Sequence, residues 1–514
     1  MNIRVAVVGI DGLSPYIAKK YFTSILNKSI TATLRSITPP ITAPAWISLA
    51  TGLNPGKTGI IDFLNTVDLN RRMLKPVTSN VYKGLAVWDY ASLAGYKVCI
   101  IDYPMLYPPY SVNGVMLSGF LSPKWLSYPE SLASKMEIRV GPHWEHIYFS
   151  IDRKYNDVII FLEELLKSFE KKIKWSLYLL DKGDWDLFID VISHTDWLFH
   201  RCWHILDPNH KTALKIKELY EEAINAEAKR LIDYFFNMLT LYVAEVNAHA
   251  LNTVIVSDHG FGPLDYIVNT AKLLKLLRLT KFKLLNPFIK PHGFINRAKW
   301  FLTPKAFEKT PFELNIKPYD VIDYENSVIY TLPHDELIMA LYINKKYYKE
   351  RSKLLAYIEN KIKELIGIPA SLIDLHRLYK GPIKHSLPDA LVVIQNYSAY
   401  FEFKPYSNYL LRRSCMRRYT GIHRINGVFI ASGTNFRRTS NQKPFSIEIN
   451  LLDVAPLVLS LLGIPIPKYI DGTLRNEFLH GELPRLNTKN IIKLRKHFII
   501  SLMKLKGLLH TSYE

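Results

Sequence analysis

The chain has 514 residues, of which 48% are hydrophobic and 22% charged, and 66 Lys and Arg against 46 Asp and Glu give a net charge of +20. This composition is typical of a globular protein and excludes disordered and collagen-like chains. The charge favours negatively charged partners, such as nucleic acid, anionic lipid or a phosphate-bearing substrate. Only three cysteines are present, Cys99, Cys202 and Cys415. Their number and spacing argue against a disulfide framework and favour a reducing compartment.

The hydrophobic pattern alternates between apolar strands and amphipathic helices along the chain. Strands are expected at 5–10, 97–103, 187–192, 253–257, 390–395 and 427–431, and helices at 157–172 and 212–248. This alternation predicts an α/β fold with a mostly parallel central sheet and helices on both faces. Ligands of such sheets bind at the carboxyl ends of the strands, and three expected strands run there into Asp11, Asp196 and Asp258.

Two segments differ from this pattern. The stretch 265–387 is rich in Lys, Pro and aromatic residues and is expected to be a cap inserted into a catalytic domain of residues 1–480. Residues 484–514 are expected to form a basic amphipathic helix, whose apolar residues recur every three to four positions: Ile491, Leu494, Phe498, Leu502, Leu505 and Leu509.

The sequence shows neither a signal-peptide pattern at its start nor an uncharged apolar run of 18 residues or more. We therefore expect a cytoplasmic protein without a transmembrane segment. The basic terminal helix packs on the protein's own core or contacts an anionic membrane peripherally.

The segment Gly52–Thr58 ends in the Gly-Lys-Thr of a phosphate-binding loop. The Walker A pattern requires four residues between its glycines, whereas three separate Gly52 from Gly56. Pro55 removes a backbone donor inside the loop, and the residues before it are expected to be helical rather than a strand. This match is therefore interpreted as a coincidence.

Asp and His residues that suit a zinc-like metal ion lie scattered along the chain. Asp196 and His200 are four residues apart and share one face if 195–204 is helical. Individually, such residues are also typical of turns, caps and helix pairs. His194 and His204 lie close in sequence, so the spacing alone does not decide which histidines are ligands.

A loop rich in Pro and Thr precedes a helix that is expected to begin with Pro44. Thr42, just before it, either begins the helix or presents its hydroxyl at the positive end of the helix dipole, where a phosphate is stabilised. A metal ion would make this hydroxyl a nucleophile.

Several motifs in this order resemble the alkaline phosphatase superfamily, specifically its type I phosphodiesterase/nucleotide pyrophosphatase family. They are Val8-Gly9-Ile10-Asp11-Gly12, Pro40 to Trp46, Thr51-Gly52 with Pro55-Gly56, Asp196 to Arg201, Ser257 to Gly262, Gly421 to Arg424, Asp453 to Pro456 and Leu462 to Pro465. The resemblance spans about residues 1 to 475. Each motif alone is weak, but their common order is specific.

The resemblance implies a site with two divalent metal ions, usually zinc, with iron or manganese in some relatives. Asp196, His200 and His423 would hold one ion. The other ion would be bound by Asp11, Asp258, His259 and the oxygen of Thr42. Thr42 would attack phosphorus, and water would then hydrolyse the resulting phosphothreonine.

Departures from the family pattern concern the substrate. Thr58 stands where relatives usually have His, and Phe63 where nucleotide pyrophosphatases have an Asn that contacts a phosphoryl oxygen. Asn65 faces the same side of an extended segment and is a candidate replacement; Arg424 is the second candidate for substrate binding.

The expected function is metal-dependent hydrolysis of a small phosphate ester, most directly a phosphodiester or nucleotide pyrophosphate. Phosphomonoester, phosphonate and phospholipid-headgroup hydrolysis or transfer remain alternatives, as does a catalytically weak anion- or membrane-binding protein on the same fold. Thr at the nucleophile position disfavours a sulfatase. The oligomeric state is left open.

The net charge is concentrated in two places. Residues 403–447 contain nine Lys and Arg and no Asp or Glu, and residues 484–514 contain seven Lys and Arg and one Glu. The first block surrounds His423 and is either a solvated face or a surface that steers an anionic substrate to the metals. Phosphate chemistry explains the charge better than nucleic-acid binding, which is not expected.

Overall fold

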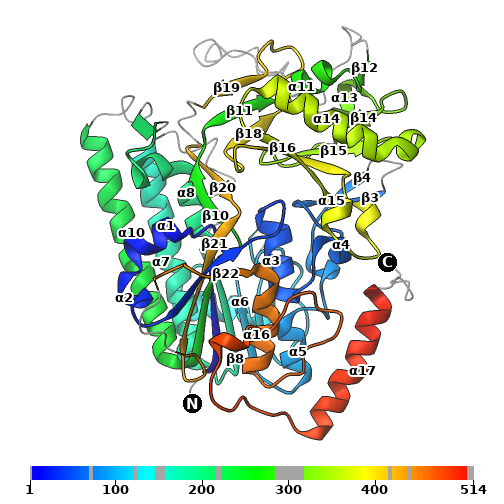
Figure 1. The fold of residues 1–514 in the computed structure, drawn as a ribbon. Coiled ribbons are helices and arrows are strands. Elements are labelled where there is room, and N and C mark those ends of the chain that lie inside the picture. Colours follow the sequence, from blue (N-terminus) through cyan, green and yellow to red (C-terminus); the bar gives the residue numbers. More distant parts are fainter. Residues whose placement is uncertain are drawn as a thin grey trace.

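The computed structural model describes residues 3–68, 73–120, 122, 125–144, 157–211, 213–214, 222–283, 318–414, 419–437 and 443–505. A nine-stranded sheet forms the centre of the molecule (Figure 1). In spatial order its strands are β22 (Glu448–Asn450), β2 (Ile30–Arg35), β21 (Asn426–Gly433), β9 (Ala250–Val256), β1 (Ile3–Ile10), β8 (Leu187–Ile192), β5 (Val98–Ile101), β6 (Gly114–Leu117) and β7 (Ser127–Tyr128). Only β21 and β7 run against the other strands of this sheet. The expected α/β fold with a mostly parallel sheet is confirmed.

Strand β1 shows why both faces of the sheet are covered. Its side chains are apolar in succession, and alternate residues point to opposite faces. Val5 and Val7 join one hydrophobic cluster, while Ala6 and Val8 join the other. The first cluster includes residues of α3 (Thr42–Thr51), α5 (Val87–Leu93) and α16 (Val454–Leu461). The second includes residues of α1 (Pro15–Tyr21), α6 (Ser131–Val140), α7 (Val158–Lys182), α8 (His194–Leu206) and α10 (Glu222–His249).

The expected elements differ from the observed ones mainly at their ends. The helix expected at 157–172 continues to Lys182 as α7, and the one expected at 212–248 is described from Glu222 as α10. Helix α3 begins at Thr42, two residues before the expected start at Pro44. Proline is tolerated there because the first-turn amides have no partner within the helix.

Above the sheet, smaller sheets form a second region around a hydrophobic cluster of its own (Figure 1). One has the order β14 (Ile329–Tyr330), β15 (Met339–Ile343), β17 (Ala390–Ile394), β16 (Ala370–Asp374), and another the order β18 (Ala399–Glu402), β11 (Tyr266–Asn269), β19 (Leu411–Arg413). Helices α11 (Thr270–Leu277) and α14 (Arg351–Ile366) pack in the same cluster. We call this region the cap.

The strand expected at 390–395 lies in the cap and not in the central sheet, so that placement was wrong. As β17 it pairs antiparallel with β15 and β16. All five of its residues are buried. A strand buried on both faces has the same continuous apolar pattern in either sheet, so the pattern could not assign it. The proposed division into residues 1–480 with an insertion at 265–387 stays a prediction, and residues 284–317 lie outside the described part.

The cap is anchored on the loops that surround the carboxyl ends of the central strands. Ile41 and Ile61 are buried in the cap's hydrophobic cluster. The Tyr379 hydroxyl accepts a hydrogen bond from Thr38 N at 2.7 Å and donates one to Thr38 O at 2.8 Å. The loop that leads into α3 is therefore held by the cap as well as by the sheet.

The basic terminal segment forms α17 (Thr488–Leu505), which packs against α5 at the margin of the molecule opposite α10 (Figure 1). Of the residues expected on its buried face, Leu494 and Leu505 are buried, whereas Leu502 is 37% exposed. Leu509 lies outside the described residues. Among the described helices, none is both long and apolar enough to cross a membrane.

The remaining elements are short connections and pairings. They are α2 (Thr23–Leu26), α4 (Pro55–Thr58), α13 (Pro318–Val321), α15 (Leu375–Leu378), β3 (Leu64–Asp68), β4 (Met73–Pro76), β10 (Gly260–Pro263), β12 (Lys281–Phe282), β13 (Ile322–Asp323) and β20 (Gly421–Arg424).

Candidate active site

The carboxyl ends of three adjacent strands, β9, β1 and β8, converge beneath the cap. Asp11 follows β1 directly, and Asp258 comes two residues after β9. After β8 the chain enters α8, whose first turn contains Asp196. The strand order therefore brings together the three carboxylates that the sequence places at strand ends.

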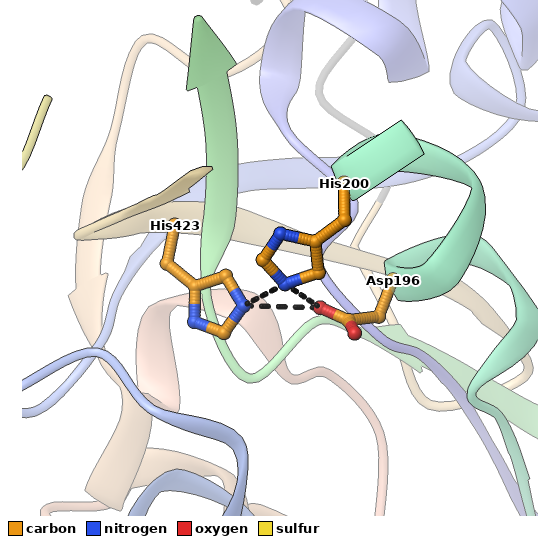
Figure 2. Close-up of side chains that lie close together, drawn as sticks. All are labelled: Asp196, His200 and His423. Atoms are coloured by element: carbon orange, nitrogen blue, oxygen red, sulfur yellow. Dashed lines mark hydrogen bonds and ion pairs between the residues drawn. The ribbon is translucent and has the colours of Figure 1, made fainter. Parts of the chain in front are cut away.

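One group of side chains consists of Asp196, His200 and His423, all buried (Figure 2). His423 Nε2 lies 3.0 Å from Asp196 Oδ1 and 3.1 Å from His200 Nε2. Asp196 and His200 share a face of α8, as the four-residue spacing predicts, and His423 comes from β20. The three ligand-type atoms therefore meet at one point.

The second group consists of Asp11, Asp258 and His259, which are also buried. His259 Nε2 lies 3.4 Å from Asp11 Oδ1 and 3.3 Å from Asp258 Oδ2. The other oxygen of each carboxylate accepts a hydrogen bond from a residue outside the group. Trp46 Nε1 donates to Asp11 Oδ2 at 3.0 Å, and the amide of Gly12 donates to Asp258 Oδ1 at 3.3 Å.

Thr42 lies beside the second group. It is the first residue of α3, and its Oγ1 is 3.4 Å from His259 Nε2. Its side chain is buried and does not cap the helix, because the cap position is Ile41. The positive end of the helix dipole therefore lies at this hydroxyl, which favours negative charge on it.

The orientation of the imidazoles shows that both groups suit a cation. Each Nδ1 faces a backbone carbonyl, which can only accept: Gly421 O for His200, Pro40 O for His423 and Gly260 O for His259. Each Nδ1 must therefore carry a proton and donate it to the carbonyl, and each Nε2 points toward the carboxylates. This is the arrangement that second-sphere carbonyls impose on metal-binding histidines.

The carboxylates of the second group are also arranged in a way that a bound cation would stabilise. Among the described residues, Asp11 Oδ1 and Asp258 Oδ2 are buried without a hydrogen-bond donor. Burial, reinforced by Asp258, raises the pKa of Asp11 well above its usual value, and burial also raises that of Asp258. Burial lowers the pKa of His259, so its ring is neutral at neutral pH and supplies no compensating charge. A divalent cation fits this set of oxygen and nitrogen donors.

The two groups are adjacent, since the ring of His259 lies against that of His423. Burial also lowers the pKa of His200 to about 4. The site thus places imidazoles and carboxylates in two neighbouring sets, which is the arrangement expected of a bimetallic centre.

The other histidines of α8 point elsewhere. His194 Nε2 is 3.0 Å from Ser168 Oγ, and His204 Nδ1 is 3.2 Å from Thr420 Oγ1. Neither belongs to the two groups. Among the described residues, the structure therefore places His200 in a metal-type group and His194 and His204 outside both.

The two candidate substrate residues stay predictions. Arg424 is partly buried, and its guanidinium donates to the backbone carbonyls of Tyr397 and Pro263. Burial lowers the pKa of Arg424 to about 10. Asn65 lies on β3, but its side chain is outside the described part of the structure.

The Gly-Lys-Thr segment is not a phosphate-binding loop. It follows helix α3 and not a strand, as expected. Lys57 Nζ pairs with Asp471 Oδ1 at 2.6 Å and donates to Tyr469 O at 2.7 Å. Its ammonium therefore ties this loop to the C-terminal part of the chain.

Sequence reasoning missed a polar contact between the cap and the core. His334 of the cap contacts Asp62 with Nδ1–Oδ2 at 2.9 Å, and its Nε2 lies 2.8 Å from the hydroxyl of Tyr342. The amide of Asp335 also donates to Asp62 Oδ2, at 3.0 Å. Burial, Asp62 and Glu336 raise the pKa of Asp335, and Asp196 adds to the effect. Asp335 therefore lies within electrostatic reach of the metal-type groups.

Three solved structures of two proteins are similar to this chain at low sequence identity. Murine ectonucleotide pyrophosphatase/phosphodiesterase 5 appears in two of them, one of which is an inactive variant in complex with AMP; both are 13% identical, with a TM-score of 0.49 over 93% of this chain and 100% of their own. The human protein of the same name is 12% identical, with a TM-score of 0.49 over 94% of this chain and 100% of its own. A comparison with curated proteins found no match.

The family model described as type I phosphodiesterase / nucleotide pyrophosphatase matches residues 5–352. This match covers most of the chain, including the loop with Thr42 and all three strand-end carboxylates, Asp11, Asp196 and Asp258. The resemblance seen in the sequence motifs is confirmed: the chain belongs to the type I phosphodiesterase/nucleotide pyrophosphatase family of the alkaline phosphatase superfamily.

Proposed function

We propose that the protein hydrolyses phosphate esters, with a phosphodiester or nucleotide pyrophosphate as substrate, through a phosphothreonine formed on Thr42. The observation that carries the proposal is the convergence of two buried metal-type groups beside a threonine at a helix N-terminus. The family match supports hydrolysis as the reaction class.

Two sets of residues would each hold one divalent ion. Asp196, His200 and His423 would hold one divalent ion, and Asp11, Asp258 and His259 the other. When bound, such ions lower the pKa of a hydroxyl and offset the charge of a phosphoryl group. Zinc fits the donor set, as do iron and manganese.

In the first step Thr42 Oγ1 gives up its proton and forms a bond to phosphorus while the ester or anhydride bond to the leaving group breaks, and the leaving oxygen takes up one proton. In the second step a water oxygen bonds to phosphorus, the bond between phosphorus and Thr42 Oγ1 breaks, and one proton of the water passes to Oγ1, which restores the hydroxyl. The dipole of α3 stabilises negative charge on Oγ1 before the first step and after the second. Splitting the reaction in this way replaces one difficult displacement by two easier ones.

The decisive experiment compares Thr42→Ala with Thr42→Ser and Ser48→Ala. Ser48 lies on the same helix and is buried, and its hydroxyl has no hydrogen-bond partner among the described residues. Rates are measured on a chromogenic phosphodiester, a phosphomonoester and a nucleotide pyrophosphate, together with the metal content. We expect Thr42→Ala to lose activity by roughly 10³-fold or more, Thr42→Ser to keep part of it, and Ser48→Ala to resemble wild type.

Three other results would count against the proposal. Faster turnover of the monoester would replace the diester assignment by phosphomonoester hydrolysis. Unchanged activity in Thr42→Ala would remove Thr42 as nucleophile. A folded, metal-loaded protein without activity on phosphate diesters, monoesters, pyrophosphates and phosphonates would indicate a binding protein on this fold.

A further inference from the structure

Helix α17 has two apolar faces, and among the described residues only one of them packs on the rest of the chain. On the inner face, Leu494 and Leu505 are buried, and Phe498 lies against Tyr90 with ring centroids 5.4 Å apart. Three polar side chains of the helix donate to backbone carbonyls of the body: Asn490 to Ala94 O, and His497 and Ser501 to Gly84 O. These contacts hold the helix in one rotation about its axis.

The outer face carries large aliphatic side chains into solvent. Ile492 is 50% exposed, Ile499 61% and Ile500 47%, and Leu502 and Met503 are also exposed. Ile492, Ile499 and Met503 are spaced by seven and four residues and therefore form one stripe along the helix. Because the hydrogen bonds of the inner face prevent rotation of α17 about its axis, the stripe stays exposed to solvent.

Basic side chains border and interrupt this stripe. Lys489, Lys493, Arg495 and Lys496 are all exposed, and α17 contains no Asp or Glu. By helical spacing, Lys496 falls within the stripe, while Arg495 and Lys493 fall on opposite sides of it. Such long side chains lay their alkyl stems along apolar surface and extend their charge outward.

We infer that the outer face of α17 docks the protein on an anionic lipid surface, with the helix lying in the plane of the interface. An exposed aliphatic stripe flanked by Lys and Arg provides both attractions that peripheral binding requires, apolar burial and charge. A second copy is a poorer occupant, because a two-fold contact would place the same basic residues opposite one another. Nucleic acid would satisfy the charges and leave the isoleucines in water.

The test is sedimentation of the full chain with vesicles of phosphatidylcholine, alone or mixed with an equal amount of phosphatidylglycerol. We expect binding to the mixed vesicles only, weakened by salt. The double variant Ile492→Ser with Ile499→Ser and the double variant Lys493→Gln with Lys496→Gln should each reduce binding roughly tenfold or more. These side chains are exposed, so the fold should not change.

The matched control is Ile138→Ser, because Ile138 is 86% exposed and lies on a different helix, α6, which belongs to the other hydrophobic cluster. It should bind as wild type does. Equal binding to both vesicle types, or wild-type binding by the two double variants, would overturn the inference. So would loss of self-association in the isoleucine variant, measured by analytical ultracentrifugation, because a second copy would then cover the stripe. No readout involves hydrolysis, so the result is independent of the proposed function.

Discussion

The imidazole rings of His259 and His423 are stacked, with centroids 3.7 Å apart and planes inclined by 23°. Each ring belongs to a different metal-type group. Since Nδ1 of each ring donates to a carbonyl, the stack fixes the directions of both Nε2 lone pairs at once. The two metal-type groups therefore contact each other directly, and we expect the loss of a ligand in one group to shift the ligands of the other.

We expect His423→Ala to lose more than the ion bound by its own group. Removal of the ring takes a ligand from Asp196 and His200 and also the surface against which His259 rests. Metal analysis should show less than one ion per chain, and hydrolysis should fall by roughly 100-fold or more. His204→Asn, on the same helix as His200 but bound to Thr420, is the control and should keep both ions. Retention of one full equivalent in His423→Ala would show that the groups are independent.

Trp46→Phe tests the support of Asp11 without removing a ligand. The change deletes the Nε1–H donor to Asp11 Oδ2 and keeps most of the buried ring. Loss of such an outer-shell donor is expected to lower metal affinity and activity by about 10- to 100-fold. Titration of the metal-free protein measures this directly.

Trp88→Phe is its matched control. Trp88 lies in the same hydrophobic cluster and donates to the hydroxyl of Tyr110, outside both metal-type groups. It should lower stability to a similar degree but leave metal affinity unchanged. Equal loss of affinity in both variants would mean that packing, not the hydrogen bond, matters at Trp46.

His334→Ala should separate positioning by the cap from metal binding. The variant removes the contact with Asp62 that ties the cap to the loop after Ile61. We expect unchanged metal content and a fall in kcat/KM of roughly tenfold, since a buried hydrogen bond to a charged group contributes about 1.5–3 kcal/mol. His376→Ala, which alters a histidine bound to Leu387 O within the cap, should leave kcat/KM near wild type. A loss of metal in His334→Ala would place that residue in the metal centre instead.

Asp89 should make stability depend on pH. Its Oδ2 accepts from the amides of Gly84 and Ala86, yet burial outweighs these bonds and raises its pKa to about 7. The carboxyl is near 3.8 when unfolded, so between these values the native state binds a proton that the unfolded state lacks. Stability contributed by this group is therefore present below pH 4 and lost as pH rises to 7, by about 1.4 kcal/mol per unit of pKa difference.

Thermal unfolding at pH 5 and pH 8 measures this effect. Asp89→Asn keeps an acceptor for the two amides but cannot ionise, and should reduce the difference in stability between the two pH values. An unchanged difference would assign the pH dependence to other groups.

Most of the metal-type residues could be predicted because their positions follow from strand order. Asp11 and Asp258 stand at the ends of buried strands, and the carboxyl ends of neighbouring parallel strands meet at one edge. Asp196 and His200 follow from helical spacing. His423 could be placed only through the order of motifs, since it comes from a separate strand, β20, outside the central sheet.

What the sequence did not reveal depends on partners that no local pattern encodes. The carbonyls that orient the histidines are backbone groups of Pro40, Gly421 and Gly260, which any residue could supply. Asp62 and His334 are 272 residues apart. The outer stripe of α17 was not predicted, because the apolar repeat used in the sequence analysis follows mainly the buried face of the same helix. Local spacing thus predicts candidate metal ligands, whereas the contacts that orient these ligands depend on residues far away in the sequence.

The Tyr379 hydroxyl is hydrogen-bonded to both the N–H and the carbonyl of Thr38. These bonds limit which cap could replace the present one in an engineered protein. Since Ile41 and Ile61 complete the hydrophobic cluster of the cap, the cap is not an exchangeable module. A chimera with the cap of another protein would leave the loop before Thr42 without these contacts, unless that cap also supplied a phenol at the position of Tyr379 and apolar side chains to cover Ile41 and Ile61. Substrate range in this architecture should therefore be altered by point changes inside the resident cap, and not by transplantation.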